Sequence, residues 1–507
     1  MDKNAISKLL IEYEEENQEV LEKVLVKGFN AWHIVKTSLY WGIIEKQIRG
    51  NEDVVIKKQD PIKRIARKAA EFPFLLYSFL KLVAKRLVRK SPVLFYTYSG
   101  DKLAKDSDGK YVNFLVDIIV TEGITKSYIY AERSIQGNFK IPSKVGIDFK
   151  VDSLDCLRFF FLNYYKNNNK LRKAAGTLFL DFSGFLSKKN VTLPFSEKVI
   201  FEILISFCTE FYLSLLLLRI CRPSFIITSE KIGTGLLGAA NKLGIGSLDL
   251  QHGIIDRFHT QYIFRGNRDS TKAKLLLSSF VGVFGELHKK ILMNNGFWKE
   301  KEIVVLGSSR VDMNRKRYRR RDDKWSAPQK RILIPSQWTS FDETIILLNA
   351  LCANISTYTV FLKIHPLEPP VNIARFNQLS KEYSERLIIA DKDLDIYTLI
   401  EDAFLLIGFD SAALLEAVTL GVPCITITTK KASLGIHSMF NDERLKTAII
   451  PIALSQPALI IETINRSIED FNYYSELVAS ANKQGDYLYA DHYIDNCKEF
   501  VSTVVNN

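Results

Sequence analysis

The sequence predicts an α/β protein with two doubly wound parallel sheets, preceded by a helical N-terminal extension. Apolar runs of strand length alternate with helical segments in two blocks, residues 92–312 and 331–480. Between the blocks, residues 313–330 are polar, strongly basic and without apolar periodicity, which is typical of a linker. The 507 residues also exceed what one ordinary core holds, so two domains with additions at the ends are expected.

Composition and charge narrow the class of protein. Hydrophobic residues make up 47% and charged residues 25%, which is ordinary for a globular protein. The six cysteines are scattered without a CxxC pair, which suits a reducing cytoplasm and predicts neither a disulfide framework nor a zinc site. The N-terminus has no basic segment followed by an apolar one, so no signal peptide is expected.

The formal charge of +12 suits an anionic membrane, phosphorylated substrates or nucleic acid. No zinc-finger or helix-turn-helix signature is present, so nucleic acid is the least favoured partner. No metal motif stands in a suitable loop, and no cofactor is expected.

Residues 1–91 are expected to form a helical, basic extension. Within it, 62–91 carry an uncharged stretch, 72–80, that is too short to span a bilayer and has many lysines and arginines on both sides. This pattern suits an interfacial helix on anionic lipid, which would hold the protein at the cytoplasmic face of the membrane. A packing helix with a solvated basic face fits the pattern equally well.

The strands expected in the first block are short apolar runs followed by polar loops: 93–98, 127–132, 224–228, 248–251, 280–284 and 303–306. A helix at 233–243, closed by Gly244, joins two of them and makes them parallel. Ser229, Glu230 and His252 should therefore lie at one edge of the sheet. The apolar run 211–218 is expected to be a buried helix rather than a membrane span.

The second block repeats this alternation. Its expected strands are 331–335, 359–364, 386–390, 403–407 and 424–427. A helix at 412–420 is stopped by Gly421. The final segment, 481–507, is expected to be helical and to pack back on the first domain.

Four motifs each follow a predicted strand: QHG at 251–253, GSSRVD at 307–312, KIHP at 363–366 and GFDSAALLEA at 408–417. This set resembles the GT-B glycosyltransferases of bacterial surface polysaccharides, in which two Rossmann-like domains face a central cleft. It is most similar to the CDP-glycerol glycerophosphotransferases of teichoic acid synthesis, which carry HG, GxxRxD, KxHP and a DxSS-like motif in this order. It also resembles capsule transferases that use CMP-linked acidic sugars. The resemblance covers roughly residues 224–425.

The resemblance implies roles for residues at both sheets. His252 matches the family's HG histidine, a base or acceptor-side polariser, and Glu230 is the alternative base. His365 matches the histidine that contacts the donor phosphate. Lys363 shares its side of the strand and either adds positive charge or is an ordinary exposed lysine. Ser336 and Gln337 lie at the same edge and are expected to bind the diphosphate or the base.

Ser411 and Asp410 precede a predicted helix, where they either bind phosphate or only cap the helix. Glu416, further along that helix, is carried over as a contact to the ribose hydroxyls. Arg310 either contacts phosphate or pairs with Asp312 to fix the hinge. The sequence departs from the glycerophosphotransferase pattern in lacking its second serine, which argues against CDP-glycerol as the donor.

Together these features predict a transferase of capsule, O-antigen or teichoic-type synthesis. It would move a sugar or polyol phosphate from a nucleotide-activated donor, with CMP or CDP favoured, to a glycan or lipid-linked acceptor without a metal ion. A UDP-sugar transferase or a 2-epimerase-like enzyme on the same fold is one alternative. A non-catalytic nucleotide-binding scaffold of a polysaccharide assembly complex is another.

Overall fold

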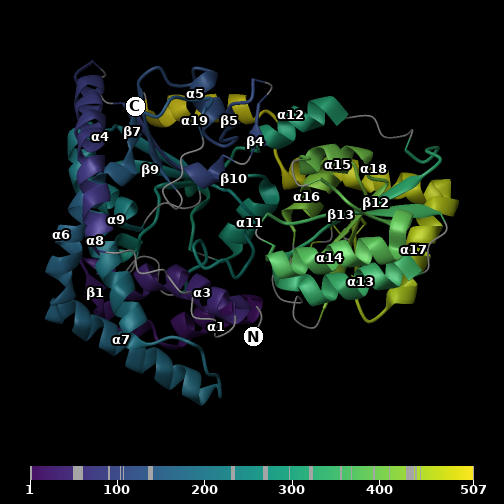
Figure 1. Cartoon of the computed structure of the whole chain (residues 1–507), viewed down its shortest axis with the longest axis horizontal. Coiled ribbons are helices and arrows are strands. Elements are labelled where there is room, and N and C mark those ends of the chain that lie inside the picture. Colours follow the sequence, from purple (N-terminus) through teal and green to yellow (C-terminus); the bar gives the residue numbers. More distant parts are fainter. Residues whose placement is uncertain are drawn as a thin grey trace.

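The structure of the chain is a computed structural model. It describes residues 3–49, 61–88, 92–102, 104–106, 108–134, 141–229, 234–265, 272–295, 297–318, 324–353, 357–366, 368–391, 394–409, 411–429, 439, 442, 444–445 and 447–505. Within the described residues, two parallel sheets form two α/β domains, which lie on the left and right of Figure 1.

The N-terminal sheet has seven parallel strands in the order β11-β10-β9-β8-β3-β6-β7. The strands are β3 (Val93–Tyr98), β6 (Tyr128–Arg133), β7 (Phe149–Lys150), β8 (Phe225–Ser229), β9 (Gly246–Leu250), β10 (Phe280–Val283) and β11 (Ile303–Val305). The chain starts at β3, builds outward through β6 and β7, and then returns to place β8 to β11 on the other side. The strand order therefore reverses between β3 and β8, which is the kind of place where α/β sheets bind ligands.

The C-terminal sheet has six parallel strands in the order β14-β13-β12-β15-β16-β17. The strands are β12 (Lys330–Pro335), β13 (Tyr358–Lys363), β14 (Leu387–Ile389), β15 (Leu405–Gly408), β16 (Cys424–Thr428) and β17 (Ile449–Ala453). Here the order reverses between β12 and β15. Two doubly wound sheets confirm the predicted fold class, the two-Rossmann GT-B architecture.

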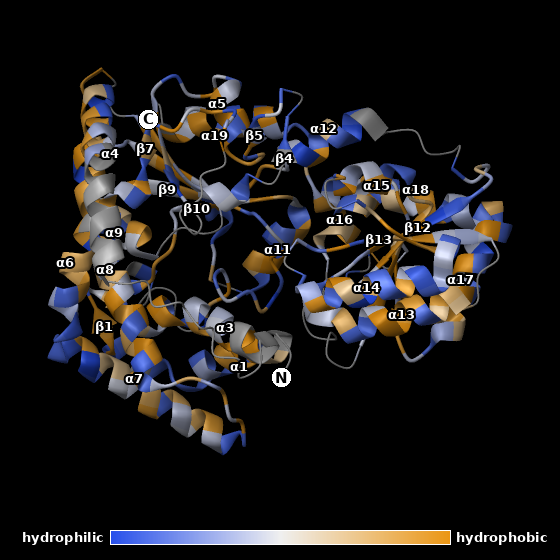
Figure 2. Cartoon of the chain, viewed as in Figure 1, coloured by the Kyte–Doolittle hydropathy of each residue, from blue (hydrophilic) through white to orange (hydrophobic). Residues whose placement is uncertain are grey.

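Helices cover both faces of the C-terminal sheet (Figure 1). On one face lie α13 (Phe341–Ala353), α14 (Pro370–Tyr383) and α17 (Pro457–Glu469), and on the other lie α15 (Ile396–Asp402) and α16 (Ala412–Thr419). Helix α18 (Phe471–Leu488) contributes its first half to the former face and its second half to the latter. The central strands β12 and β13 are mostly buried. Figure 2 shows the hydrophobic residues that make up much of the sheet. A strand covered on both sides needs an apolar side chain at nearly every position, which is why these strands read as continuous apolar runs.

The N-terminal domain is built around the long apolar helix α8 (Glu197–Cys221). It is the one helix, in the part of the chain described here, that is long and apolar enough to cross a membrane, and half of its most apolar window is buried inside the protein. It packs closely on α9 (Thr234–Leu243). The two helices approach so closely at Gly235 that a Cβ there would lie only 2.5 Å from the Cβ of Glu210. We therefore describe α8 as a core helix, as the sequence predicted for 211–218.

The expected N-terminal extension contains parts of this core. Helices α1 (Lys3–Glu16) and α3 (Ala31–Arg49) contribute Leu10, Trp32 and Val35 to the same hydrophobic cluster as α7 (Asn169–Lys188) and α8. Helix α4 (Pro61–Val88) runs along the outer side of the domain next to α8 (Figure 1), and several of its described side chains, among them Leu76, Leu80 and Leu87, are exposed. The described residues of 3–49 are thus part of the first domain rather than an appendage to it.

Two segments join the domains. The first is helix α12 (Ser309–Tyr318), which contacts α16. Residues 313–318 of the expected linker belong to this helix. The chain returns through α18 and places α19 (Tyr493–Val505) on the N-terminal sheet, where Phe500 stacks edge-on against Phe225 and Phe280.

The returning segment passes extremely close to the ends of β10 and β11. A Cβ at Gly285 would lie 2.4 Å from the carbonyl oxygen of Leu488, and one at Gly307 would lie 2.2 Å from that of Ala490. Gly307 also has a φ of +88°, a conformation that favours glycine. The glycine of the GSSRVD motif is therefore required by the passage of a neighbouring backbone.

Candidate functional site

Three of the predicted donor-site residues gather at the carboxyl edge of the C-terminal sheet. Ser336 follows β12, His365 lies just beyond β13, and Ser411 lies just beyond β15. Because β12 lies between β13 and β15, the three residues stand on adjacent strands, and Ser336 and Ser411 flank the reversal of strand order. This is the edge at which open α/β sheets bind ligands.

Ser336 organises the loop that carries His365. Its hydroxyl accepts a hydrogen bond from the backbone N–H of His365 at 2.9 Å and donates one to Oε2 of Glu368 at 2.9 Å. Glu368 Oε1 accepts in turn from the side-chain amide of Asn372 at 2.8 Å, and both Ser336 and Glu368 are buried. The hydroxyl of Ser336, expected from the sequence to face the donor, is used to position the histidine loop.

Sequence reasoning missed Glu368. The available signal was a carboxylate three residues after His365 and directly before the Pro369-Pro370 start of α14. Its partner lies 32 residues earlier, after a different strand, so the pairing could not be found from spacing.

The neighbouring predicted residues have structural partners as well. The ammonium of Lys363 donates to the backbone carbonyl of Asp391 at 2.9 Å, which ties the end of β13 to the segment after β14. Gln337 is half-buried and precedes a short 3-10 turn, Trp338–Ser340. The side chain of His365 is also half-buried at this edge.

Ser411 is the N-cap of α16. Its hydroxyl accepts from the backbone N–H of Ala413 at 3.3 Å, so the capping role that the sequence left open is present. Asp410 lies outside the described residues.

Arg310 joins the two domains. It projects from α12, forms an ion pair with Asp395 at the start of α15, and stacks its guanidinium 4.6 Å from the ring centre of Tyr397. Of the two alternatives for Arg310, the pairing with Asp312 is not formed, and Asp312 instead accepts the backbone N–H of Tyr493 at 2.7 Å. Asp395 therefore joins α15 to α12 through Arg310, whereas Asp312 holds the start of α19.

Glu416 belongs to the same interdomain cluster. Burial raises the pKa of its carboxyl, while the nearby Arg310 and the hydroxyl of Tyr397 oppose that shift. Burying a carboxylate is costly unless charged or polar neighbours compensate, and Arg310 supplies that compensation. Glu416, to which the resemblance assigns the ribose contact, therefore lies beside Arg310, the residue that joins the two domains.

His252 lies on a loop that Gln251 holds in place. The buried side chain of Gln251 accepts the backbone N–H of Phe284 at 2.8 Å and donates to the carbonyl of Gly253 at 2.7 Å. His252 itself is half-buried at the carboxyl end of β9. Ile254, two residues further, packs against the hydrophobic cluster that contains Ala413 and other residues of α16, so this loop reaches the domain interface.

Helices α1 and α3 contact the segment that follows His252. Lys36 of α3 is fully buried, pairs with Glu14 of α1 at 2.8 Å, and donates to the backbone carbonyl of Ile263 at 2.9 Å. Ser229, expected at this edge, donates to Asp101 Oδ2 at 2.7 Å. Glu230, the alternative base, lies outside the described residues. Among the residues that are described, no group of three or more His, Cys, Asp or Glu side chains is placed to hold a metal ion.

Comparison with known proteins gives structural likeness only. No family model and no curated protein matches the sequence. A UDP-GlcNAc 2-epimerase from Neisseria meningitidis aligns at 14% identity with a TM-score of 0.47, over 82% of this chain and 100% of that one. A glycosyltransferase from Rickettsia africae aligns at 11% identity with a TM-score of 0.48, over 82% and 100%. MurG from Acinetobacter baumannii aligns at 10% with a TM-score of 0.44, over 80% and 99%. The fold class follows from the two sheets themselves.

Proposed function

We propose that this protein is a metal-independent glycosyltransferase of bacterial surface polysaccharide synthesis. It transfers a sugar or polyol phosphate from a nucleotide-activated donor, with CMP or CDP favoured, to a glycan or lipid-linked acceptor. The observation that carries the proposal is the placement of His365 and Ser411 on both sides of β12, at the strand-order reversal of the C-terminal sheet.

The proposed reaction divides between the two sheets. His252 takes the proton of an acceptor hydroxyl, and the acceptor oxygen forms the new bond to the transferred group. The bond between that group and the nucleotide phosphate breaks, and the nucleotide leaves with the bonding electrons. His365, together with the positive end of the α16 helix dipole, stabilises the negative charge on the leaving phosphate.

A thermal-shift experiment tests the donor site. We expect CMP or CDP at about 100 times its Kd to stabilise the wild-type protein by about 2.7 kcal/mol. His365→Ala should abolish this stabilisation, because it removes the imidazole but keeps the backbone N–H that binds Ser336. The control Lys381→Ala removes an exposed cation of the same domain, on α14, and should respond like the wild type.

The other outcomes of this screen select among the alternatives. Stabilisation by UDP alone would discard the cytidine assignment, and acceptor-free production of an epimerised UDP-sugar would then identify a 2-epimerase-like enzyme. A protein that responds to none of CMP, CDP, UDP, GDP and ADP would contradict both the proposed enzyme and a nucleotide-binding scaffold.

We propose further that α4 holds the protein on the cytoplasmic face of an anionic membrane. Leu76, Leu80 and Leu87 are 49%, 56% and 81% exposed. At 100° per residue they fall on one narrow stripe of the helix, which is the arrangement of an interfacial helix. On the inner side, Leu82 is fully buried and Lys85 pairs with Asp148, so the helix is fixed to the domain with its leucine stripe outward.

The triple variant Leu76→Gln, Leu80→Gln, Leu87→Gln is expected to lose sedimentation with vesicles of phosphatidylglycerol and phosphatidylcholine, because the apolar stripe would no longer enter the lipid. The control Leu180→Gln, Leu459→Gln changes exposed leucines of α7 and α17 and should sediment like the wild type. Equal sedimentation of the triple variant and the wild type would reject the anchoring role of α4.

A further inference from the structure

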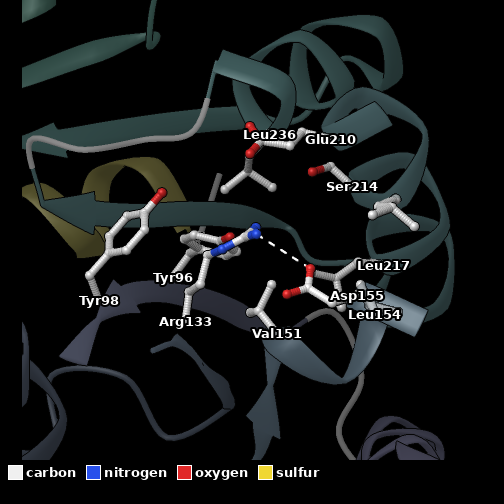
Figure 3. Close-up of a pocket in the computed structure, with 11 residues that line it drawn as sticks. Tyr96, Tyr98, Arg133, Val151, Leu154, Asp155, Glu210, Ser214, Leu217 and Leu236 are labelled. Atoms are coloured by element: carbon white, nitrogen blue, oxygen red, sulfur yellow. Dashed lines mark hydrogen bonds and ion pairs between the residues drawn. The ribbon is translucent and has the colours of Figure 1, made fainter. Parts of the chain in front are cut away.

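The N-terminal domain contains a pocket that the sequence did not indicate. It is formed by Tyr96 and Tyr98 of β3, Arg133 of β6, Asp155 of α6 (Asp155–Lys166), and Glu210 and Ser214 of α8. Figure 3 shows these side chains converging from the sheet and from the two helices. The hollow comprises about 410 Å³ including its open mouth, and its closed part holds little more than one water molecule. A bound group would therefore occupy the mouth.

The pocket stands at the ligand-binding edge of the N-terminal sheet. Tyr98 and Arg133 are the last residues of β3 and β6, and Leu236, which also lines it, belongs to the helix that follows β8. The strand order reverses between β3 and β8, so the pocket borders the reversal point of this sheet. The proposed donor residues occupy the corresponding position in the other sheet.

The charged groups at the pocket balance one another. Arg133 contributes +1 and Asp155 and Glu210 contribute −1 each, and Arg158, which pairs with Glu210 from just outside the lining, adds +1, so the four charges sum to zero. Arg133 Nη2 lies 3.4 Å from Asp155 Oδ1, and Glu210 Oε1 lies 3.9 Å from Arg158 Nη1. The second contact is too long for a hydrogen bond, so the carboxylate of Glu210 retains acceptor capacity.

These groups suit the hydroxyls of a sugar or polyol. Carboxylates accept from hydroxyl and ammonium groups, the guanidinium of Arg133 donates to oxygen, and the half-buried ring of Tyr98 offers an apolar face. A phosphate or carboxylate group would gain no net attraction here, because Arg133 and Arg158 are already paired with the carboxylates of Asp155 and Glu210.

We infer that this pocket binds the terminal unit of the acceptor, and that this unit is a neutral or amino-bearing sugar or polyol without phosphate or carboxylate. The inference rests on the proposed transferase function and specifies its acceptor. This pocket, whose charges balance, and the phosphate-binding edge of the other sheet would then sort the two substrates by charge.

Ligand-observed NMR titration of the full chain, with the nucleotide that gives the thermal shift present, tests this inference. Glucose, N-acetylglucosamine and glucosamine are the probes, and glucose 6-phosphate is the charged counterpart. We expect the uncharged or amino sugars to bind and glucose 6-phosphate to bind more weakly. Glu210→Gln should weaken sugar binding by about tenfold, the loss of one hydrogen bond to a charged group. Ser214→Leu should block the pocket without changing its charge.

Glu202→Gln is the matched control, because Glu202 is an exposed carboxylate of the same helix outside the pocket. Unaltered sugar binding in both pocket variants, or tighter binding of glucose 6-phosphate, would overturn the inference. The nucleotide thermal shift of the same samples separates the two proposals. A normal shift without sugar binding rejects the pocket alone, whereas sugar binding without any nucleotide shift rejects the transferase.

Discussion

Replacing His252 with alanine is expected to lower turnover by about 10²- to 10⁴-fold, the usual contribution of a general base. Nucleotide binding should be unchanged, because His252 lies on the N-terminal sheet whereas His365 and Ser411 lie on the other. The loop should keep its shape, since the hydrogen bonds that fix it come from Gln251. Turnover would be measured with saturating donor and acceptor, and nucleotide binding by thermal shift.

His259→Ala is the control for this experiment. His259 lies seven residues further on the same loop, where its Nδ1 accepts the backbone N–H of Gln261 at 3.3 Å, and its replacement should leave turnover unchanged. Full activity of His252→Ala would contradict the assignment of the base and transfer the role to another acceptor-side group, Glu230 first. Simultaneous loss of nucleotide binding would show that the substitution disturbs the domain interface instead.

The second large effect is expected from Gly307→Ala, which should destabilise the protein by about 2–5 kcal/mol. Alanine at this position combines an unfavourable φ of +88° with a Cβ only 2.2 Å from the carbonyl oxygen of Ala490. The contact is with backbone, which cannot move aside as a flexible side chain can, so the segment around Ala490 must shift. Urea denaturation would measure the loss.

Gly146→Ala provides the matched glycine control. Gly146 has no left-handed φ and no atom within 4 Å of an added Cβ, so its unfolding midpoint should stay close to that of the wild type. A Gly307→Ala protein that unfolds at the same urea concentration as Gly146→Ala would mean that the segment 488–490 does not pass as closely as the structure shows.

The sequence predicted the two sheets because buried parallel strands leave a direct signal. Strands β8, β9, β12, β13 and β15 are almost entirely buried and therefore read as apolar runs that end in polar loops. Strand β17 was missed because Pro451 interrupts it, and proline is tolerated there only because β17 is an edge strand.

The contacts of the site were less predictable, because they join residues that are distant in sequence. The Arg310–Asp395 pair spans 85 positions, and the Ser336–Glu368 bond spans 32. Motif spacing suggested a local partner for Arg310, Asp312, whereas in the folded chain its partner is Asp395 of the other domain. The pocket at Tyr98 and Glu210 left no motif at all, since its residues come from strands β3 and β6, a 3-10 turn, and helices α6, α8 and α9.

The position of α19 bears on the order in which the domains complete during synthesis. Phe500 and Tyr493 fill the face of the N-terminal sheet formed by residues such as Phe95 and Phe225, and no earlier segment replaces them in the described structure. Between the end of that sheet and the arrival of Tyr493, the ribosome must translate the whole C-terminal domain, which takes roughly 10–40 s at 5–20 residues per second. During that interval the first domain has an uncovered apolar surface. The nascent chain is therefore expected to need chaperone protection until its last helix emerges.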